Sequence, residues 1–133
     1  MPSIKARRIS VIAVKNALES GKLKCFAADV LSSEPMVKKC PLFNCKNTII
    51  ATSTISYLQG NEKIDKSWQK IIDKRNLALK EIAEEFKYTF NDLYSVSVSI
   101  PKEERTPEGV HYTKNGYDYF ARQVAQKIKE NIK

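Results

Sequence analysis

The sequence has 133 residues, of which 42% are hydrophobic and 29% charged, with a formal net charge of +8. This composition is typical of a folded domain and excludes collagen-like, low-complexity and disordered classes. No apolar run approaches the roughly 20 residues that a membrane helix needs, and MPSIKARRIS lacks the apolar region of a secretory signal. We therefore expect a single-domain cytoplasmic protein, spanning residues 1–133, that does not contact a membrane.

The basic excess lies in the first part of the chain, where residues 1–56 carry nine Lys and Arg against three Asp and Glu. No aromatic residues interleave with these basic clusters, so we interpret them as a solvated face and expect no nucleic-acid partner. Three cysteines, Cys25, Cys40 and Cys45, are interpreted as reduced thiols. The one histidine lies far from them along the chain, so we expect no metal site.

Hydrophobic periodicity predicts the elements of the first half. Apolar residues at helical spacing predict a helix over 11–20, which Gly21 ends. A nearly continuous apolar run predicts a buried strand over Cys25–Leu31, and Thr48–Thr52 is predicted as a second buried strand. The segments 32–41 and 57–62 are predicted as loops.

The second half contains the longest predicted helix, over residues 64–87, and we expect its apolar side to pack on the sheet through Trp68, Ile72, Leu79 and Phe86. A short strand over 89–94, a polar loop over 95–110 and a helix capped by Thr113 follow. Alternating strands and helices predict an α/β fold, with a small parallel sheet between helices in a flavodoxin-like or Rossmann-like three-layer arrangement.

In such a fold, functional groups collect beyond the carboxyl ends of the strands. Four segments are predicted there: Asp29–Glu34, Thr52–Thr54, Asn91-Asp92 and the loop that ends at His111. In the last of these, Glu108 precedes the imidazole by three residues. A carboxylate on one imidazole nitrogen fixes the tautomer and leaves the other nitrogen as a general base. The alternative interpretation is a loop histidine bonded to solvent and backbone.

Residues 47–133 resemble the C-terminal part of the SGNH (GDSL-type) esterase and acetylhydrolase family. The resemblance is carried by the segments 48–54, Arg75-Asn76, 80–85, 91–95 and above all 107–117, PEGVHYTKNGY. That family has Asp-x-x-His there, followed by a helix that begins near a Gly-Tyr pair. The resemblance implies that His111 is the catalytic base and that Glu108 stands in the place of the triad aspartate.

The family's Gly-Asp-Ser block, which holds the nucleophile, does not occur in this sequence. Ser53 is a candidate substitute, with a plain strand-end hydroxyl as the alternative interpretation. Without an activated nucleophile and an oxyanion hole, a carboxylate and a histidine catalyse little ester hydrolysis. The resemblance therefore implies a catalytically incomplete hydrolase domain whose substrate, where it is active, is a small acetyl ester, and which uses no cofactor.

Residues 5–57 resemble a different family, the cofactor-domain end of the D-2-hydroxyacid dehydrogenases. The matching segments are 17–23, 27–30, 33–35 and 41–43. Glu34 matches the glutamate that orients that family's histidine, and Asp29 matches the aspartate near the nicotinamide. However, the catalytic Arg and His positions fall on Lys5 and Thr54, and the Gly-x-Gly-x-x-Gly fingerprint that would hold a nicotinamide cofactor is absent.

Two resemblances in one chain suggest a chimera, with a dehydrogenase-like segment at 1–56 and a hydrolase-like segment at 57–133. Three hypotheses remain open from the sequence: an SGNH-type hydrolase domain, a non-catalytic or engineered α/β scaffold, and a relic of a nicotinamide-dependent dehydrogenase. Whether the chain is an enzyme is left open, with the balance against it because of the missing nucleophile block.

Overall fold

The computed structural model describes residues 11–23, 41–45 and 48–132, and they belong to two compact units, 1–47 and 48–133. Each unit is described by itself. The predicted strand Cys25–Leu31 lies outside the described residues, as do Lys5, Asp29 and Glu34, the positions matched to dehydrogenase residues. The prediction of one domain over 1–133 stays a prediction.

The first unit contains the helix α1, Val11–Glu19, and the short 3-10 helix η1, Pro41–Asn44, which pack against each other. Helix α1 ends as predicted, because Gly21 adopts a φ of 71° that side chains rarely tolerate. Val14 is buried, whereas Ile12, one of the apolar residues at helical spacing, is exposed.

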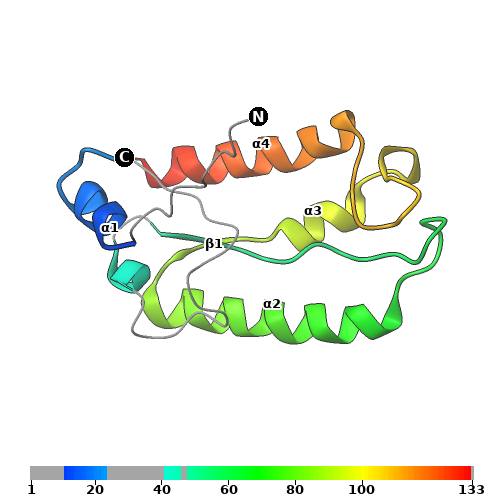
Figure 1. The fold of residues 1–133 in the computed structure, drawn as a ribbon, viewed down its shortest axis with the longest axis horizontal. Coiled ribbons are helices and arrows are strands. Elements are labelled where there is room, and N and C mark those ends of the chain that lie inside the picture. Colours follow the sequence, from blue (N-terminus) through cyan, green and yellow to red (C-terminus); the bar gives the residue numbers. More distant parts are fainter. Residues whose placement is uncertain (1–10, 24–40, 46–47, 133) are drawn as a thin grey trace, which may run out of the picture. The chain divides into compact units, whose positions relative to one another are not determined.

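The second unit is built on two parallel strands, β1 (Ile49–Ala51) and β2 (Thr89–Asn91), joined by the helix α2 (Lys66–Phe86). The register pairs Ile49 with Thr89 and Ala51 with Asn91. Helix α4 (Lys114–Asn131) lies on the side of the strands opposite to α2 (Figure 1). The mixed α/β class is confirmed. The described residues form a sheet of two strands, so the larger flavodoxin-like sheet stays a prediction.

Local capping chemistry explains where the two long helices begin and end. The Asp65 carboxylate accepts hydrogen bonds from the backbone N–H groups of Ser67 and Trp68 at the start of α2. That helix ends at Lys87, which adopts the left-handed conformation with a φ of 54°. The Thr113 hydroxyl accepts from the Gly116 N–H at the start of α4, as the sequence predicted.

A short helix, α3 (Leu93–Ser99), occupies the end of the predicted strand and the start of the predicted polar loop. The predicted strand end at 93–94 and the predicted loop from residue 95 were therefore wrong, and the three serines of LYSVSVS favour a loop over a helix interior. The structure is helical because Asp92 is an N-cap that accepts hydrogen bonds from the N–H and the hydroxyl of Ser95. Ile100, which precedes Pro101, ends the helix in an extended conformation.

The best-buried cluster of the second unit joins the end of α3 to the start of α4. It consists of Ile100, Tyr112 and Phe120, with Leu93 and Val96 packed against it. The Tyr112 ring meets the Phe120 ring edge to face, with 4.9 Å between their centroids, a geometry that aromatic pairs prefer. Tyr112, the residue directly after His111, is therefore a fixed point of the core.

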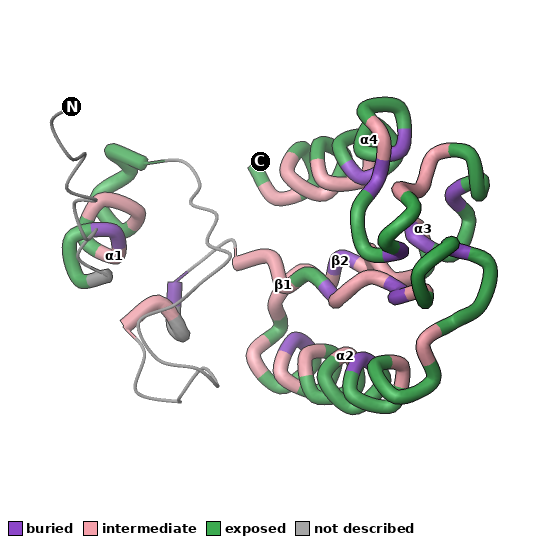
Figure 2. Tube along the Cα trace, turned by 45° about the vertical axis from the view of Figure 1, so that its right-hand side comes forward, coloured by how far each residue is buried: buried purple, intermediate pink, exposed green. Residues whose placement is uncertain are grey.

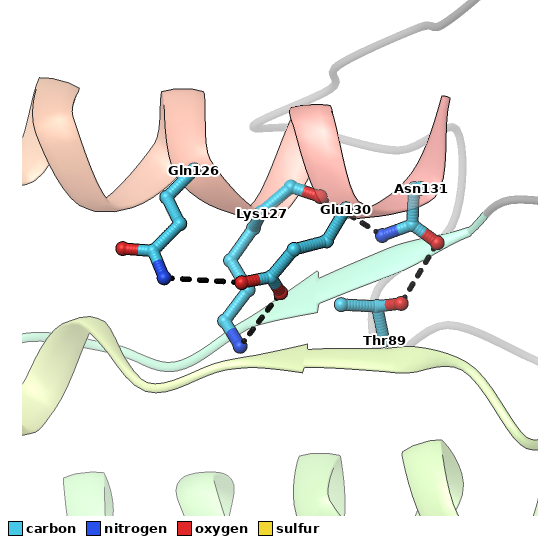
Figure 3. A network of polar contacts seen from close by, with 5 residues as sticks. All are labelled: Thr89, Gln126, Lys127, Glu130 and Asn131. Carbon is cyan, nitrogen blue, oxygen red and sulfur yellow. Dashed lines mark hydrogen bonds and ion pairs between the residues drawn. The ribbon is translucent and has the colours of Figure 1, made fainter. Parts of the chain in front are cut away.

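Polar contacts fasten the other end of α4 to the start of β2 (Figure 3). The Thr89 hydroxyl donates to the Asn131 side-chain oxygen at 2.8 Å, and the Asn131 amide donates to the Lys127 carbonyl. Gln126 and Lys127 both contact the Glu130 carboxylate. None of the helices in the described part of the chain is long and apolar enough to cross a membrane.

The buried side of α2 differs from the predicted one. Ile72 and Ala83 are buried, but Trp68 is 51% exposed, and exposed residues cover the side of α2 away from the strands (Figure 2). Two amides share the inner side: Gln69 donates to the Tyr94 hydroxyl, and Asn76 bonds the backbone of Ser53. These contacts rotate the helix so that Trp68 lies at the edge of the interface, and the prediction that it packs on the sheet was wrong.

This orientation predicts different costs for two truncations in α2. Trp68→Ala should lower the free energy of unfolding by less than about 1 kcal/mol, as exposed substitutions do. Ile72→Ala, the matched control on the buried side, should cost about 2–5 kcal/mol. Urea denaturation followed by circular dichroism measures both, and a larger loss for Trp68→Ala than for Ile72→Ala would contradict the assigned face.

Candidate functional site

Two hairpins of the second unit form the candidate site, one after β1 and one before α4. After β1 the chain continues extended to the hairpin 57–64, closed by an antiparallel bridge between Tyr57 and Ile64 and by the Leu58 N–H, which donates to the Lys63 carbonyl. The second hairpin, 105–112, is closed by a bridge between Arg105 and Tyr112 and leads into α4. The first hairpin thus lies beyond the carboxyl end of β1, where the sequence placed the functional loops.

The two hairpins meet backbone to backbone. The Tyr57 N–H donates to the Gly109 carbonyl at 2.9 Å, and the Gly60 N–H donates to the Pro107 carbonyl at 2.7 Å. The Arg105 guanidinium lies over the Tyr57 ring, 4.2 Å from its centroid, and donates to the Ile100 carbonyl. These contacts hold the 105–112 hairpin against the rest of the unit.

The 105–112 hairpin brings Glu108 and His111 together as predicted. The His111 Nδ1 atom lies 2.8 Å from the Glu108 Oε1 atom. The turn between them is closed by the Gly109 N–H, which donates to the Thr106 carbonyl, and by the Thr106 N–H, which donates to the His111 carbonyl. Both side chains are largely exposed, 64% for His111 and 51% for Glu108.

The protonation of Glu108 determines what this pair can do chemically. Its own backbone N–H and the His111 ring hold the pKa of the Glu108 carboxyl below its usual range. An ionised carboxylate is an acceptor only, so the His111 Nδ1 atom donates to it. The Nε2 atom of a neutral imidazole then carries the lone pair, which is the state of a general base.

Buried hydroxyl groups form a second polar cluster behind the 105–112 hairpin. The Ser97 hydroxyl accepts from the Ile55 N–H at 2.9 Å and donates to the Tyr94 carbonyl. Burial raises the pKa of the Tyr112 phenol, although hydrogen bonds with Thr54 and Ser97 oppose the shift. This cluster fastens Tyr112 to the segment that follows β1, and it fixes the end of the 105–112 hairpin.

Ser53, the candidate nucleophile, is held by its backbone. Its N–H donates to the Asn76 side-chain oxygen at 2.8 Å, and its carbonyl accepts from the Asn76 amide at 3.0 Å. Within residues 48–132 no hydrogen bond joins the Ser53 hydroxyl to His111. Asp92, another predicted site residue, caps α3 instead. In the described part of the chain, no group of three or more His, Cys, Asp or Glu side chains is arranged to hold a metal ion.

Sequence reasoning missed the residues that hold the 105–112 hairpin: Tyr57, Asn61, Arg105 and Gly109. Gly60-Asn61 was read as part of a loop, and the dipeptide is a turn signal. Its contacts with the other hairpin, more than 40 residues away in the sequence, leave no local pattern.

Comparisons with known proteins find a solved structure that is similar to part of this chain. No family model and no curated protein matches the chain. Among solved structures, the chain is similar to the "putative acylhydrolase" of Bacteroides fragilis NCTC 9343, with a TM-score of 0.52 and 30% sequence identity. The match covers 65% of this chain, about the share that the 48–133 unit makes up, and 44% of that chain.

This likeness supports a hydrolase-like α/β domain, and this chain spans less than half the length of the similar protein. The dehydrogenase and chimera interpretations of the first 56 residues receive no support from the comparisons.

The lowered pKa of Glu108 predicts a dependence of stability on pH. Because the folded-state pKa lies below the unfolded value, this group's stabilisation is present above the unfolded pKa, about 4.3, and is lost as the pH falls through the folded pKa. Carboxyl NMR titration should show the Glu108 pKa rising towards its usual value in His111→Ala. An unchanged Glu108 pKa in that variant would contradict the described contact.

Gly109 and Gly60 give a matched pair for testing the close approach of the hairpins. Both have positive φ, 85° and 91°, but a Cβ at Gly109 would lie 2.3 Å from the Tyr57 carbonyl oxygen, whereas a Cβ at Gly60 would meet open space. Gly60→Ala should therefore cost only the backbone strain, about 1–2 kcal/mol. Gly109→Ala should cost more in urea denaturation, and equal costs would contradict the close approach.

Proposed function

We propose that the 48–133 unit is the base-carrying part of an SGNH-type acyl hydrolase that cleaves small esters. The observation that carries the proposal is the 2.8 Å contact between the His111 Nδ1 and Glu108 Oε1 atoms, in a chain similar to a protein named as an acylhydrolase. The motif around this pair resembles the SGNH pattern, with Glu108 in place of the aspartate. In the similar protein's name the acyl group is not specified, and the preference for a small acetyl ester comes from the family resemblance.

The proposed role of His111 is proton transfer during acyl transfer. As a hydroxyl oxygen attacks the acyl carbon, the Nε2 atom accepts the hydroxyl proton, and it then gives that proton to the leaving alkoxide oxygen. The negative Glu108 carboxylate stabilises the imidazolium that forms between these two steps. The attacking hydroxyl belongs to water or to a serine, for which Ser53 is the candidate in this chain.

The geometry supports a slow reaction by the chain as it stands. Since both side chains of the pair are largely exposed, solvent screens the charge interaction between them. Efficient acyl transfer also needs donors preorganised for the oxyanion, and the sequence lacks the Gly-Asp-Ser block with which the family builds its nucleophile. We therefore expect weak esterase activity, above that of free histidine.

Hydrolysis of p-nitrophenyl acetate tests the proposal, with free histidine at equal concentration as the background. His111→Ala should reduce the activity to background, because general-base catalysis contributes about 10²-fold or more. Glu108→Gln should reduce it by a smaller factor, since it removes the charge that fixes the tautomer but leaves the base. Glu103→Gln, which changes an exposed carboxylate of the 3-10 helix η2 (Lys102–Glu104), is the matched control and should retain full activity.

Two results would contradict the proposal. Activity that survives in His111→Ala, or wild-type activity no higher than free histidine, leaves the non-catalytic scaffold as the better description of the chain.

A further inference from the structure

We propose that Asn61 is the positioning residue of the Glu108–His111 pair, because its side chain holds the hairpin on which both residues stand. The effect of Asn61 on catalysis rests on the proposed function, whereas its effect on the geometry of the pair does not. Asn61 lies on the other hairpin, 57–64, and does not hydrogen-bond Glu108 or His111.

The conformation and burial of Asn61 are unusual for a residue in a hairpin turn. Its φ is 51°, in the left-handed region, where Asn is favoured over other residues with side chains. The side chain is directed inward, and the residue is only 7% exposed although its neighbours Gly60 and Glu62 are exposed. Burying an amide is costly unless it forms hydrogen bonds. The hydrogen bonds that Asn61 forms therefore matter to the structure around it.

The Asn61 amide bonds the first two residues of the 105–112 hairpin. Its Nδ2 atom lies 3.3 Å from the Arg105 carbonyl oxygen and 3.4 Å from the Thr106 carbonyl oxygen. The backbone N–H groups of Gly60 and Tyr57 bond the next carbonyls, those of Pro107 and Gly109. Within the described residues, Asn61 is the member of this row of contacts that acts through its side chain, so a substitution can remove it selectively.

Thr106 connects the Asn61 contact to the reactive pair. Its carbonyl accepts from Asn61 and from the Gly109 N–H, directly after Glu108, and its own N–H donates to the His111 carbonyl at 3.0 Å. A displacement of Thr106 therefore moves both partners of the pair. Because the two side chains are exposed, their relative orientation depends on the backbone beneath them, and a misplacement of about 1 Å can reduce a rate about 100-fold.

The alternative is that Asn61 only stabilises the fold. The side-chain ¹⁵N signals of His111 distinguish this role from positioning of the pair. His111 is the one histidine of the sequence, so no other imidazole contributes ring-nitrogen signals. At alkaline pH, where the imidazole is neutral, they report which nitrogen carries the proton. The Glu108 contact should hold the proton on Nδ1, and loss of the orientation should shift the signals towards those of a solvated imidazole.

The experiment compares three variants of the full chain. Asn61→Gly accepts the positive φ and removes the amide, and Asn61→Asp keeps the side-chain shape but replaces the N–H donors with a carboxylate. Asn131→Ala is the matched control, because it also removes an Asn side chain with two hydrogen bonds, at the opposite end of α4. Each variant is tested for its fold by circular dichroism, for the His111 ¹⁵N signals, and for kcat and KM with p-nitrophenyl acetate.

We expect the Asn61 variants to fold, to shift the His111 signals and to lower kcat about 10–100-fold with KM within about twofold, while Asn131→Ala changes none of these. Wild-type His111 signals in the folded Asn61 variants overturn the proposal, as does an equal shift in Asn131→Ala. Failure of both Asn61 variants to fold also overturns it, since the role is then structural. If the wild type lacks esterase activity, the proposed function fails, and the ¹⁵N signals alone decide the positioning of the pair.

Discussion

The backbone of Gly109 lies so close to that of Tyr57 that no side chain fits between them. A Cβ at Gly109 would lie 2.3 Å from the Tyr57 carbonyl oxygen and 2.9 Å from that of Leu58. Only glycine combines this approach with a φ of 85°. The contact fixes the reactive turn against the segment that leaves β1, so the position of Glu108 and His111 relative to the strands depends on the absence of one methyl group.

A second close approach secures the other side of the same turn. A Cβ on Gly116 would lie 2.5 Å from the Glu104 carbonyl oxygen, so the first turn of α4 packs directly on η2 (Lys102–Glu104). The Glu104 carbonyl accepts from the Thr113 N–H, and its carboxylate accepts from the Thr113 hydroxyl. Because Tyr112 is buried and Gly109 is held against Tyr57, the backbone is fixed on both sides of His111, whose own side chain stays exposed.

The parts of the fold that could be predicted are those whose signals lie within one segment. The Thr113 cap and the long apolar periods predicted α2 and α4 to within a few residues, and the three-residue spacing of Glu108 and His111 predicted their pairing. Helix α3 was missed because its three serines favour a loop over a helix interior and only Asp92 marks its start. The exposure of Trp68 could not be predicted, because Gln69 and Asn76 bond the chain after β2 and β1 and so rotate the helix.

The same distinction between local and distant signals applies to the candidate site. A carboxylate and an imidazole three residues apart are visible in the sequence, but the groups that orient them come from a hairpin more than 40 residues earlier. Most of these groups are backbone N–H donors, which many sequences could supply, and the one side chain among them, the Asn61 amide, lies too far along the chain to form a local motif with the pair. A sequence motif therefore identifies the reactive atoms of such a site, whereas its geometry depends on two glycines and an asparagine that the motif does not specify in full. Two side chains exposed to solvent can still form a 2.8 Å contact because hydrogen bonds fix the backbone that carries them.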